Sequence, residues 1–236
     1  EGDMMRTRPP LRNGVSTSFG QLNAGKRGIV LDLKRAEAVT AARCLIQGAD
    51  VIVENSRPGV MKRLGLDYAA LAGEAPRLIY CSISGYGRTG PRAAEPGYDF
   101  VIQAESGLMS ITGEPDGAPM KLGVAITDLV TGMNATQAIL AALLARHNTG
   151  QGQLIDLALL DSAVSVLANV GAGYLAAGHE PRRFGNGHPT VVPYQIFATA
   201  DGAFALGVGN DAQFAALCTA LGEPQWAQDE RYRTNR

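Results

Sequence analysis

Short apolar runs alternate with stretches of helical composition through the first third of the chain. Three of these runs are almost continuously apolar and end at charged, Gly or Pro residues. Strands without polar alternation are typical of a parallel sheet that is covered on both faces, and this strand and helix order predicts βαβ units. The predicted strands are 28–34, 49–54 and 77–84, and the predicted helices are 36–47, 60–65 and 68–73.

The middle of the chain is dominated by helical patterns. Residues 128–147 carry the clearest one, because Leu129, Met133 and Leu140 recur on one side at helical spacing and the pattern stops before Gly150. The other elements predicted here are a helix over 98–111, a strand over 153–157 and a helix of mostly small residues over 159–177.

Near residue 190 the pattern changes from alternating strands and helices to a pair of strands. Residues 194–200 and 203–208 flank Asp201-Gly202, a dipeptide typical of tight β-hairpin turns. A last helix is predicted over 212–221.

We therefore expect an α/β fold in two parts. Residues 1–190 are predicted to form a large Rossmann-like domain, with a parallel sheet and helices on both faces. Residues 191–236 are predicted to begin a smaller α+β domain.

Composition excludes several classes of function. The 236 residues carry 21 basic and 22 acidic side chains, so no basic excess favours a nucleic-acid partner. The longest apolar run, Ala138–Ala145, is too short to span a bilayer, and no export signal is visible. The three histidines show no metal-ligand spacing, so no metal site is predicted. The three cysteines lie apart in apolar runs, which favours buried thiols in a reducing compartment.

Asp128 is the position with the most chemical content. It follows Thr127 and begins the clearest helix, where free N–H groups and the helix dipole favour a carboxylate. One interpretation is a plain helix N-cap. The other is a nucleophile or base held at a helix start in a cleft, and the spacing alone leaves both open.

Loops that follow the predicted strands carry polar and basic residues. Gly85–Pro91 follows one strand, and Asn55–Arg57 with Lys62-Arg63 follows another. Ligands of parallel sheets bind at the carboxyl ends of strands, so these loops are candidates for a phosphate-binding rim; the alternative is ordinary solvated charge. Dinucleotide and P-loop glycine fingerprints are absent from the sequence.

Several of these segments together resemble the class III CoA transferases of the CaiB/BaiF type, which include formyl-CoA transferase. The matching segments occur in family order along nearly the whole chain, and the subgroup they most resemble is the succinyl-CoA:dicarboxylate CoA transferases. The segments are Lys26–Lys34, Val53–Gly59, Tyr80–Gly87, Gly97–Asp99, Gly123–Asp128, Thr149–Gly152, Val192–Tyr194 and Gly207–Phe214.

The resemblance implies roles for particular residues. Asp128 matches the family's nucleophilic aspartate. Pro96, Gly97 and Tyr98 match positions beside the thioester, and residues 185–188 match a glycine-rich loop over the aspartate. The positions that match the family's CoA pocket are Leu31, Asp32, Leu33, Lys34, Asn55, Ser56 and Arg63.

The resemblance also implies what the protein works with. Its substrates are expected to be an acyl-CoA and a carboxylic acid, with no tightly bound cofactor and no membrane partner. Interlocked homodimers are expected, in the cytoplasm or, in a eukaryote, the mitochondrial matrix. The family's first βαβ unit is expected upstream of Glu1, and its C-terminal segment beyond residue 236. Arg88, Arg92 and Lys121 are candidates, by charge and neighbourhood, for binding the distal carboxylate of a dicarboxylate.

Two other functions remain open at this point. A 2-methylacyl-CoA racemase is the first alternative. Racemases related to this family place a histidine where this chain has Tyr98, and the absence of that histidine argues for transfer. A non-catalytic CoA-binding subunit is the second.

Overall fold

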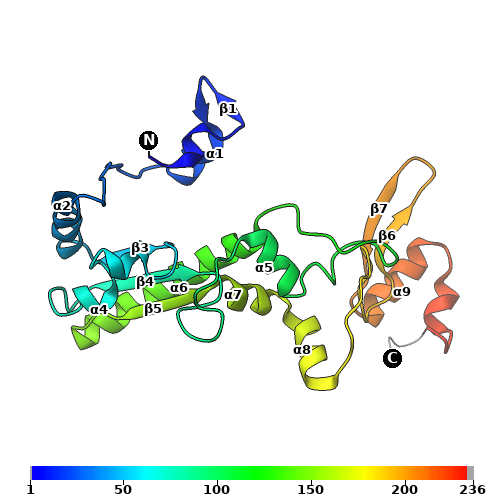
Figure 1. Cartoon of the computed structure of the whole chain (residues 1–236). Coiled ribbons are helices and arrows are strands. Elements are labelled where there is room, and N and C mark those ends of the chain that lie inside the picture. Colours follow the sequence, from blue (N-terminus) through cyan, green and yellow to red (C-terminus); the bar gives the residue numbers. More distant parts are fainter. Residues whose placement is uncertain (1, 233–236) are drawn as a thin grey trace. The chain divides into compact units, whose positions relative to one another are not determined.

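The computed structural model describes residues 2–232 and has a mixed α/β fold built on a three-stranded sheet. The strands are β3 (Val51–Glu54), β4 (Ile79–Ser84) and β5 (Leu154–Ala158), in the order β3-β4-β5 (Figure 1). Each corresponds to a predicted strand. Helices flank this sheet, as expected for strands that are apolar on both faces.

The contacts between neighbouring strands show that the sheet is parallel. At the start of the two strands, the Ile79 N–H of β4 donates to Asp50 O, just before β3, at 3.1 Å. At their other end, the side chain of Asn55, just after β3, donates to Ile83 O of β4. The partner numbers rise together, which is the signature of parallel strands. The predicted parallel α/β architecture is confirmed.

Two hairpins and a set of helices complete the described fold. The helices are α1 (Thr17–Leu22), α2 (Ala36–Gln47), α3 (Val60–Arg63), α4 (Tyr68–Leu71), α5 (Asp99–Glu105), α6 (Ile126–Thr149), α7 (Leu159–Val166), α8 (Ala168–Ala177) and α9 (Asp211–Ala220), with 3-10 turns η1 (Met4–Thr7) and η2 (Pro224–Gln228). The antiparallel hairpins are β1 (Leu11–Arg12) with β2 (Val15–Ser16), and β6 (Tyr194–Ala198) with β7 (Ala203–Gly207).

The chain divides into two compact units. The first contains residues 1–52, 59–80 and 142–154, and the second contains residues 53–58, 81–141 and 155–236. The predicted domain boundary between residues 190 and 191 falls inside the second unit.

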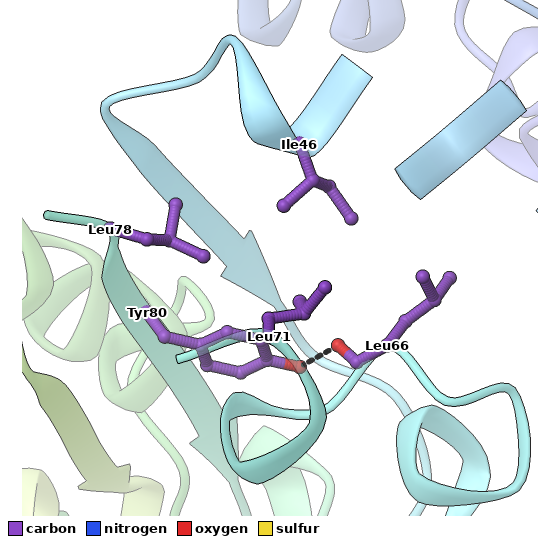
Figure 2. Close-up of a cluster of buried hydrophobic side chains, with 5 residues drawn as sticks. All are labelled: Ile46, Leu66, Leu71, Leu78 and Tyr80. Atoms are coloured by element: carbon purple, nitrogen blue, oxygen red, sulfur yellow. Dashed lines mark hydrogen bonds between the residues drawn. The ribbon is translucent and has the colours of Figure 1, made fainter. Parts of the chain in front are cut away.

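The first unit has a small apolar core around the buried start of β4. Figure 2 shows the cluster, in which the Tyr80 hydroxyl donates a 3.0 Å hydrogen bond to the Leu66 carbonyl. This bond satisfies two buried polar groups and lets a tyrosine pack among aliphatic side chains. The members of the cluster are Ile46, Leu66, Leu71, Leu78 and Tyr80.

The second unit has its own core, where α5 packs on α7. Ile102 of α5 and Ala163 of α7 are completely buried, and Leu108 and Leu159 complete the cluster. This core fixes α5, and with it the segment that precedes α5 in the chain.

The predicted strand over 28–34 is wrong. Residues 26–32 form no helix or strand, and Ile29 and Val30 are 65% and 79% exposed. A strand is stabilised by ladder hydrogen bonds to a neighbour, and no strand of residues 2–232 pairs with this run. The N-terminal region contains the short elements η1, β1, β2 and α1.

The predicted helix over 159–177 is two helices, because the chain bends by 87° between α7 and α8. Ala168, at the junction, has a φ of 48°, which places it in the left-handed region and ends the first helix. The predicted helix over 98–111 is likewise shorter and ends at Glu105, shortly before Gly107 with a φ of 90°.

One cysteine prediction is wrong: Cys81 and Cys218 are buried, but Cys44 is exposed. Cys44 lies two residues before the buried Ile46 in α2. Two helical steps turn the side chain by about 200°, so the two residues face opposite sides.

Among residues 2–232, α6 is the one unbroken helix whose length and apolar content would allow it to cross a bilayer, a test that core helices also pass. Its polar side chains make bonds within the protein. Thr131 donates to the Thr127 carbonyl, and Arg146 forms a 2.8 Å ion pair with Asp50.

Candidate active site

A pocket of about 260 Å³ opens at the carboxyl ends of β3 and β4, in the second unit. This is the end of a parallel sheet at which ligands bind. Five residues predicted from the sequence to contact CoA meet here. The lining residues are Asn55, Ser56, Arg57, Pro58, Ser84, Gly85, Glu95, Pro96, Gly97 and Tyr98.

One wall of the pocket is the loop after β3, and its start is held by the sheet. The Asn55 amide donates to the Ile83 carbonyl at 2.8 Å, and the Ser56 N–H donates to Glu54 Oε2 at 2.8 Å. The other Glu54 oxygen accepts from the Ser82 hydroxyl, and the Glu54 side chain is only 9% exposed. Asn55 and Ser56 are therefore held by strand residues rather than by each other.

The opposite wall, residues 95–98, lies directly against the end of β4. A Cβ placed on Gly85 would lie 2.6 Å from the Gly97 Cα, closer than side chains approach backbone. Both positions therefore require glycine for this contact. Tyr98 lies at the pocket, just before α5, with its side chain 70% exposed.

Asp128 lies in the first turn of α6, two residues after the helix begins at Ile126, so the N-cap interpretation is wrong. The residue is exposed, yet protein surrounds enough of its carboxyl group for desolvation to raise its pKa. The negative charge of Asp99 raises this pKa further. A carboxylate with a raised pKa is more basic, and more nucleophilic once it is ionised.

The three side chains that are candidates for binding a distal carboxylate differ in the ion pairs and hydrogen bonds that they already form. The Arg92 guanidinium lies 3.8 Å from the centre of the Tyr86 ring and forms ion pairs with Glu95 and Glu105 at 2.7 and 2.8 Å. Its charge is therefore offset by two carboxylates, which argues against this candidate.

Arg88 and Lys121 form fewer ion pairs with carboxylates than Arg92 does. Arg88 donates to the Ser82 hydroxyl at 3.1 Å and lies 4.0 Å from Glu54, and Lys121 donates to the Leu122 carbonyl. Arg57 brings a further guanidinium to the pocket lining itself.

Leu31, Asp32, Leu33, Lys34 and Arg63, the other residues expected to contact CoA, belong to the first unit. Asp32 accepts a 3.2 Å bond from the Lys34 N–H, which closes a local turn. Arg63 ends the short helix α3. They do not line the pocket described above, and their role stays a prediction.

The segment 185–188 is fastened within the second unit. The Gly185 N–H donates to the Gly113 carbonyl at 3.1 Å, and His188 Nδ1 accepts from the N–H groups of Thr190 and Val191. Just before it, Arg183 donates to the carbonyls of Glu114, Ser110 and Gly117. His188 thus supports a turn, and a gating role for this segment stays a prediction.

Sequence reasoning placed Arg57 and Gly85 in candidate phosphate-binding loops, but it did not select the lining residues Pro58, Ser84 and Glu95. Pro58 follows one predicted strand and Ser84 ends another, so the rule for parallel sheets could have found these two as well. Glu95 gave no such signal, because it enters the site only when its loop folds back on Gly85.

The chain is similar to known proteins along most of its length. The chain is 51% identical over 214 residues to succinate–glutarate CoA-transferase of Agrobacterium fabrum, covering 91% of this chain and 54% of that protein. It is 46% identical over 227 residues to mouse succinyl-CoA:glutarate CoA-transferase, covering 96% and 52%. The chain thus spans about half the length of these curated relatives.

A solved structure supports the fold. A CaiB/BaiF family protein from Brucella suis is 46% identical and superposes with a TM-score of 0.83, covering 98% of this chain and 62% of that one. The family model for CoA-transferase family III matches residues 1–236. With a parallel sheet, a pocket at its carboxyl end and a family match over its whole length, this chain belongs to CoA-transferase family III.

Proposed function

We propose that the protein transfers CoA from an acyl-CoA to a carboxylic acid, with succinyl-CoA as donor and a dicarboxylate such as glutarate as acceptor. The observation that carries this proposal is the 51% and 46% identity to two transferases named for succinate or succinyl-CoA and glutarate. The pocket at the strand ends supports it, because Asn55, Ser56 and Arg57 offer donors for an anionic ligand.

Asp128 is proposed as the nucleophile. Its carboxylate attacks the thioester carbonyl, the C–S bond breaks, and a mixed anhydride forms as CoA thiolate leaves. The thiolate then attacks the Asp128 carbonyl of the anhydride, which releases the donor acid and leaves an aspartyl-CoA thioester. No external energy source is needed, because a thioester is exchanged for a thioester.

The second half reverses these steps with the acceptor. The acceptor carboxylate attacks the aspartyl thioester, thiolate leaves again, and a new mixed anhydride forms. The thiolate attacks the acceptor's acyl carbon and frees Asp128. Each tetrahedral intermediate carries an oxyanion, and the positive end of the α6 dipole beside Asp128 is proposed to favour that charge.

Only CoA, its thioesters and carboxylic acids enter this scheme, so no tightly bound cofactor is proposed. Asn55, Ser56, Pro96, Gly97 and Tyr98 are proposed to contact the acyl-CoA. The site of action is proposed to be the cytoplasm, or the mitochondrial matrix in a eukaryote.

A homodimer is also part of the proposal. Large apolar side chains of α6 remain open to solvent in the single chain: Leu129, Met133 and Leu140 are 47%, 61% and 60% exposed. Their spacing of four and then seven residues puts them on one side of the helix, as in a helix that packs against a partner.

The test is transfer measured by mass spectrometry in the complete protein, with succinyl-CoA and a panel of mono- and dicarboxylic acids. We expect glutaryl-CoA to form, Asp128→Asn and Asp128→Ala to abolish its formation while the fold persists, and hydroxylamine to trap an adduct on Asp128. Full activity of Asp128→Asn would refute the nucleophile. CoA binding without any exchange would indicate a binding subunit, and deuterium exchange at the α-carbon would indicate a racemase.

A further inference from the structure

A network of polar side chains connects the pocket wall to the turn that carries Asp128. Asp99 directly follows the pocket-lining Tyr98 and begins α5. Its Oδ1 accepts from the Thr127 N–H at 2.9 Å and from the Thr127 hydroxyl at 2.7 Å. Thr127 is the second residue of α6 and immediately precedes Asp128.

The other side of this network is a completely buried glutamine. Gln103 Nε2 donates to Asp99 Oδ2 at 2.7 Å and approaches the Val124 carbonyl at 3.4 Å. Its Oε1 accepts from the Leu122 N–H at 2.9 Å. Both ends of the amide have partners, so its orientation is fixed, and the stretch of chain from Leu122 to Thr127 is tied to α5 at both ends.

The first turn of a helix has free N–H groups that need acceptors. Here a carboxylate from another helix supplies one, and the Thr127 side chain is completely buried beneath it. A part-buried, charge-assisted pair of bonds of this kind costs more to break than an exposed cap. Asp99 therefore holds the backbone of the turn at the residue that immediately precedes Asp128.

We propose that Asp99, held by Gln103, is a positioning residue for Asp128: it fixes the first turn of α6 against the pocket wall and so sets the attack geometry of the nucleophile. This inference rests on the proposed function, because it assumes that Asp128 attacks the thioester. The geometry gains support from electrostatics, since the negative charge of Asp99 also raises the pKa of the Asp128 carboxyl.

Asp99→Asn separates this role from mere packing, because it keeps the size of the side chain. The new amide NH₂ would face the Gln103 NH₂, and turning either amide breaks a bond to Thr127 or Leu122. Adding Gln103→Glu restores an acceptor opposite the new amide NH₂ and retains one for the Leu122 N–H. Asp161→Asn is the matched control, since Asp161 is an exposed carboxylate in the first turn of α7.

In the complete protein, we expect Asp99→Asn to lower kcat about 100-fold with little change in KM for the acyl-CoA. The acid limb of kcat/KM should move to lower pH, because the like charge beside Asp128 is gone. The double variant should regain most of the lost kcat, and Asp161→Asn should match the wild type. An unchanged kcat in Asp99→Asn, or an equal loss in Asp161→Asn, overturns the proposal.

Two NMR measurements need no activity and keep this test separate from the proposed function. Asp99→Asn should expose the Thr127 amide to hydrogen exchange and lower the titration midpoint of the Asp128 carboxyl carbon, and the double variant should restore the protection. The positioning role is wrong if Asp99→Asn leaves the protection of the Thr127 amide unchanged. It is also wrong if the double variant restores this protection but not kcat. If the wild type shows no transfer, or Asp128→Asn keeps full activity, the proposed function fails while these two measurements still decide the geometry.

Discussion

At the scale of single residues, Asp128 is held in surroundings that disfavour its charge. Desolvation and Asp99 both raise the pKa of its carboxyl. The proposed reaction needs the ionised form, so transfer should fall as the pH drops through this raised pKa, at a higher pH than for an ordinary aspartate. A site that keeps a disfavoured charge gives up stability for reactivity.

Asp128→Asn should therefore increase the free energy of unfolding at pH 7. A carboxyl whose pKa is higher folded than unfolded destabilises the fold once it ionises, and this effect disappears as the pH falls below the unfolded pKa of about 3.9. Urea unfolding at pH 7 and pH 4 should show a gain that shrinks at the lower pH. A loss of stability at pH 7 would contradict the assigned surroundings.

Tyr80 is a second residue whose effect can be isolated. Tyr80→Phe removes the buried hydroxyl that donates to the Leu66 carbonyl (Figure 2). The carbonyl is left without that donor, so we expect a loss of about 1–2 kcal/mol in the free energy of unfolding. Tyr174→Phe, at a residue 50% exposed, is the control and should change little. Equal effects of both variants would mean that the buried bond adds nothing.

At the scale of elements, the pocket depends on a close approach of two backbones. The end of β4 at Gly85 and the turn before α5 at Gly97 leave no room for a Cβ. These two elements are joined through the core that α5 shares with α7, so the walls of the pocket are set by packing elsewhere in the second unit.

Gly85→Ala should lower the free energy of unfolding by about 1–3 kcal/mol, because the added methyl meets the backbone of residue 97. The displaced wall should also raise KM for the acyl-CoA. Gly173→Ala in α8 is the control: a methyl there meets open space, and alanine should stabilise the helix by about 0.5–1 kcal/mol. Urea unfolding and steady-state kinetics give both readouts, and a Gly85→Ala protein as stable as wild type would show that the loops can separate freely.

At the scale of the whole molecule, the exposed apolar side of α6 is the proposed contact with a second copy. The side chains of Leu129, Met133 and Leu140 lie on one face of a helix whose first turn also carries Asp128. A second copy packed there would place the dimer contact and the nucleophile on one element.

Met133→Glu should convert a dimer into a monomer, because a charge would be buried in the proposed contact. Sedimentation equilibrium at micromolar concentration gives the mass directly. Gln195→Glu, on the exposed strand β6, adds the same charge away from α6 and should leave the dimer intact. A wild-type protein that sediments as a monomer would refute the dimer.

The local sequence pattern was enough to predict most of the helices and strands and to identify the family. The helix over 36–47 is found with its predicted bounds, and the strands at β3, β4 and β5 lie within about two residues of prediction. Hydrophobic periodicity and turn residues act over a few positions, so they can be recognised from the sequence alone. The same holds for Asp128, whose place at a helix start follows from the residues beside it.

Long-range contacts decided the rest. The run 28–34 is apolar enough for a strand, yet a strand exists only where a neighbour pairs with it. Asn55 and Tyr98 are far apart in sequence, and only the fold brings their loops to one pocket. The bonds from Asp99 to Thr127 likewise join two helices across 28 positions, a relation that no local spacing encodes.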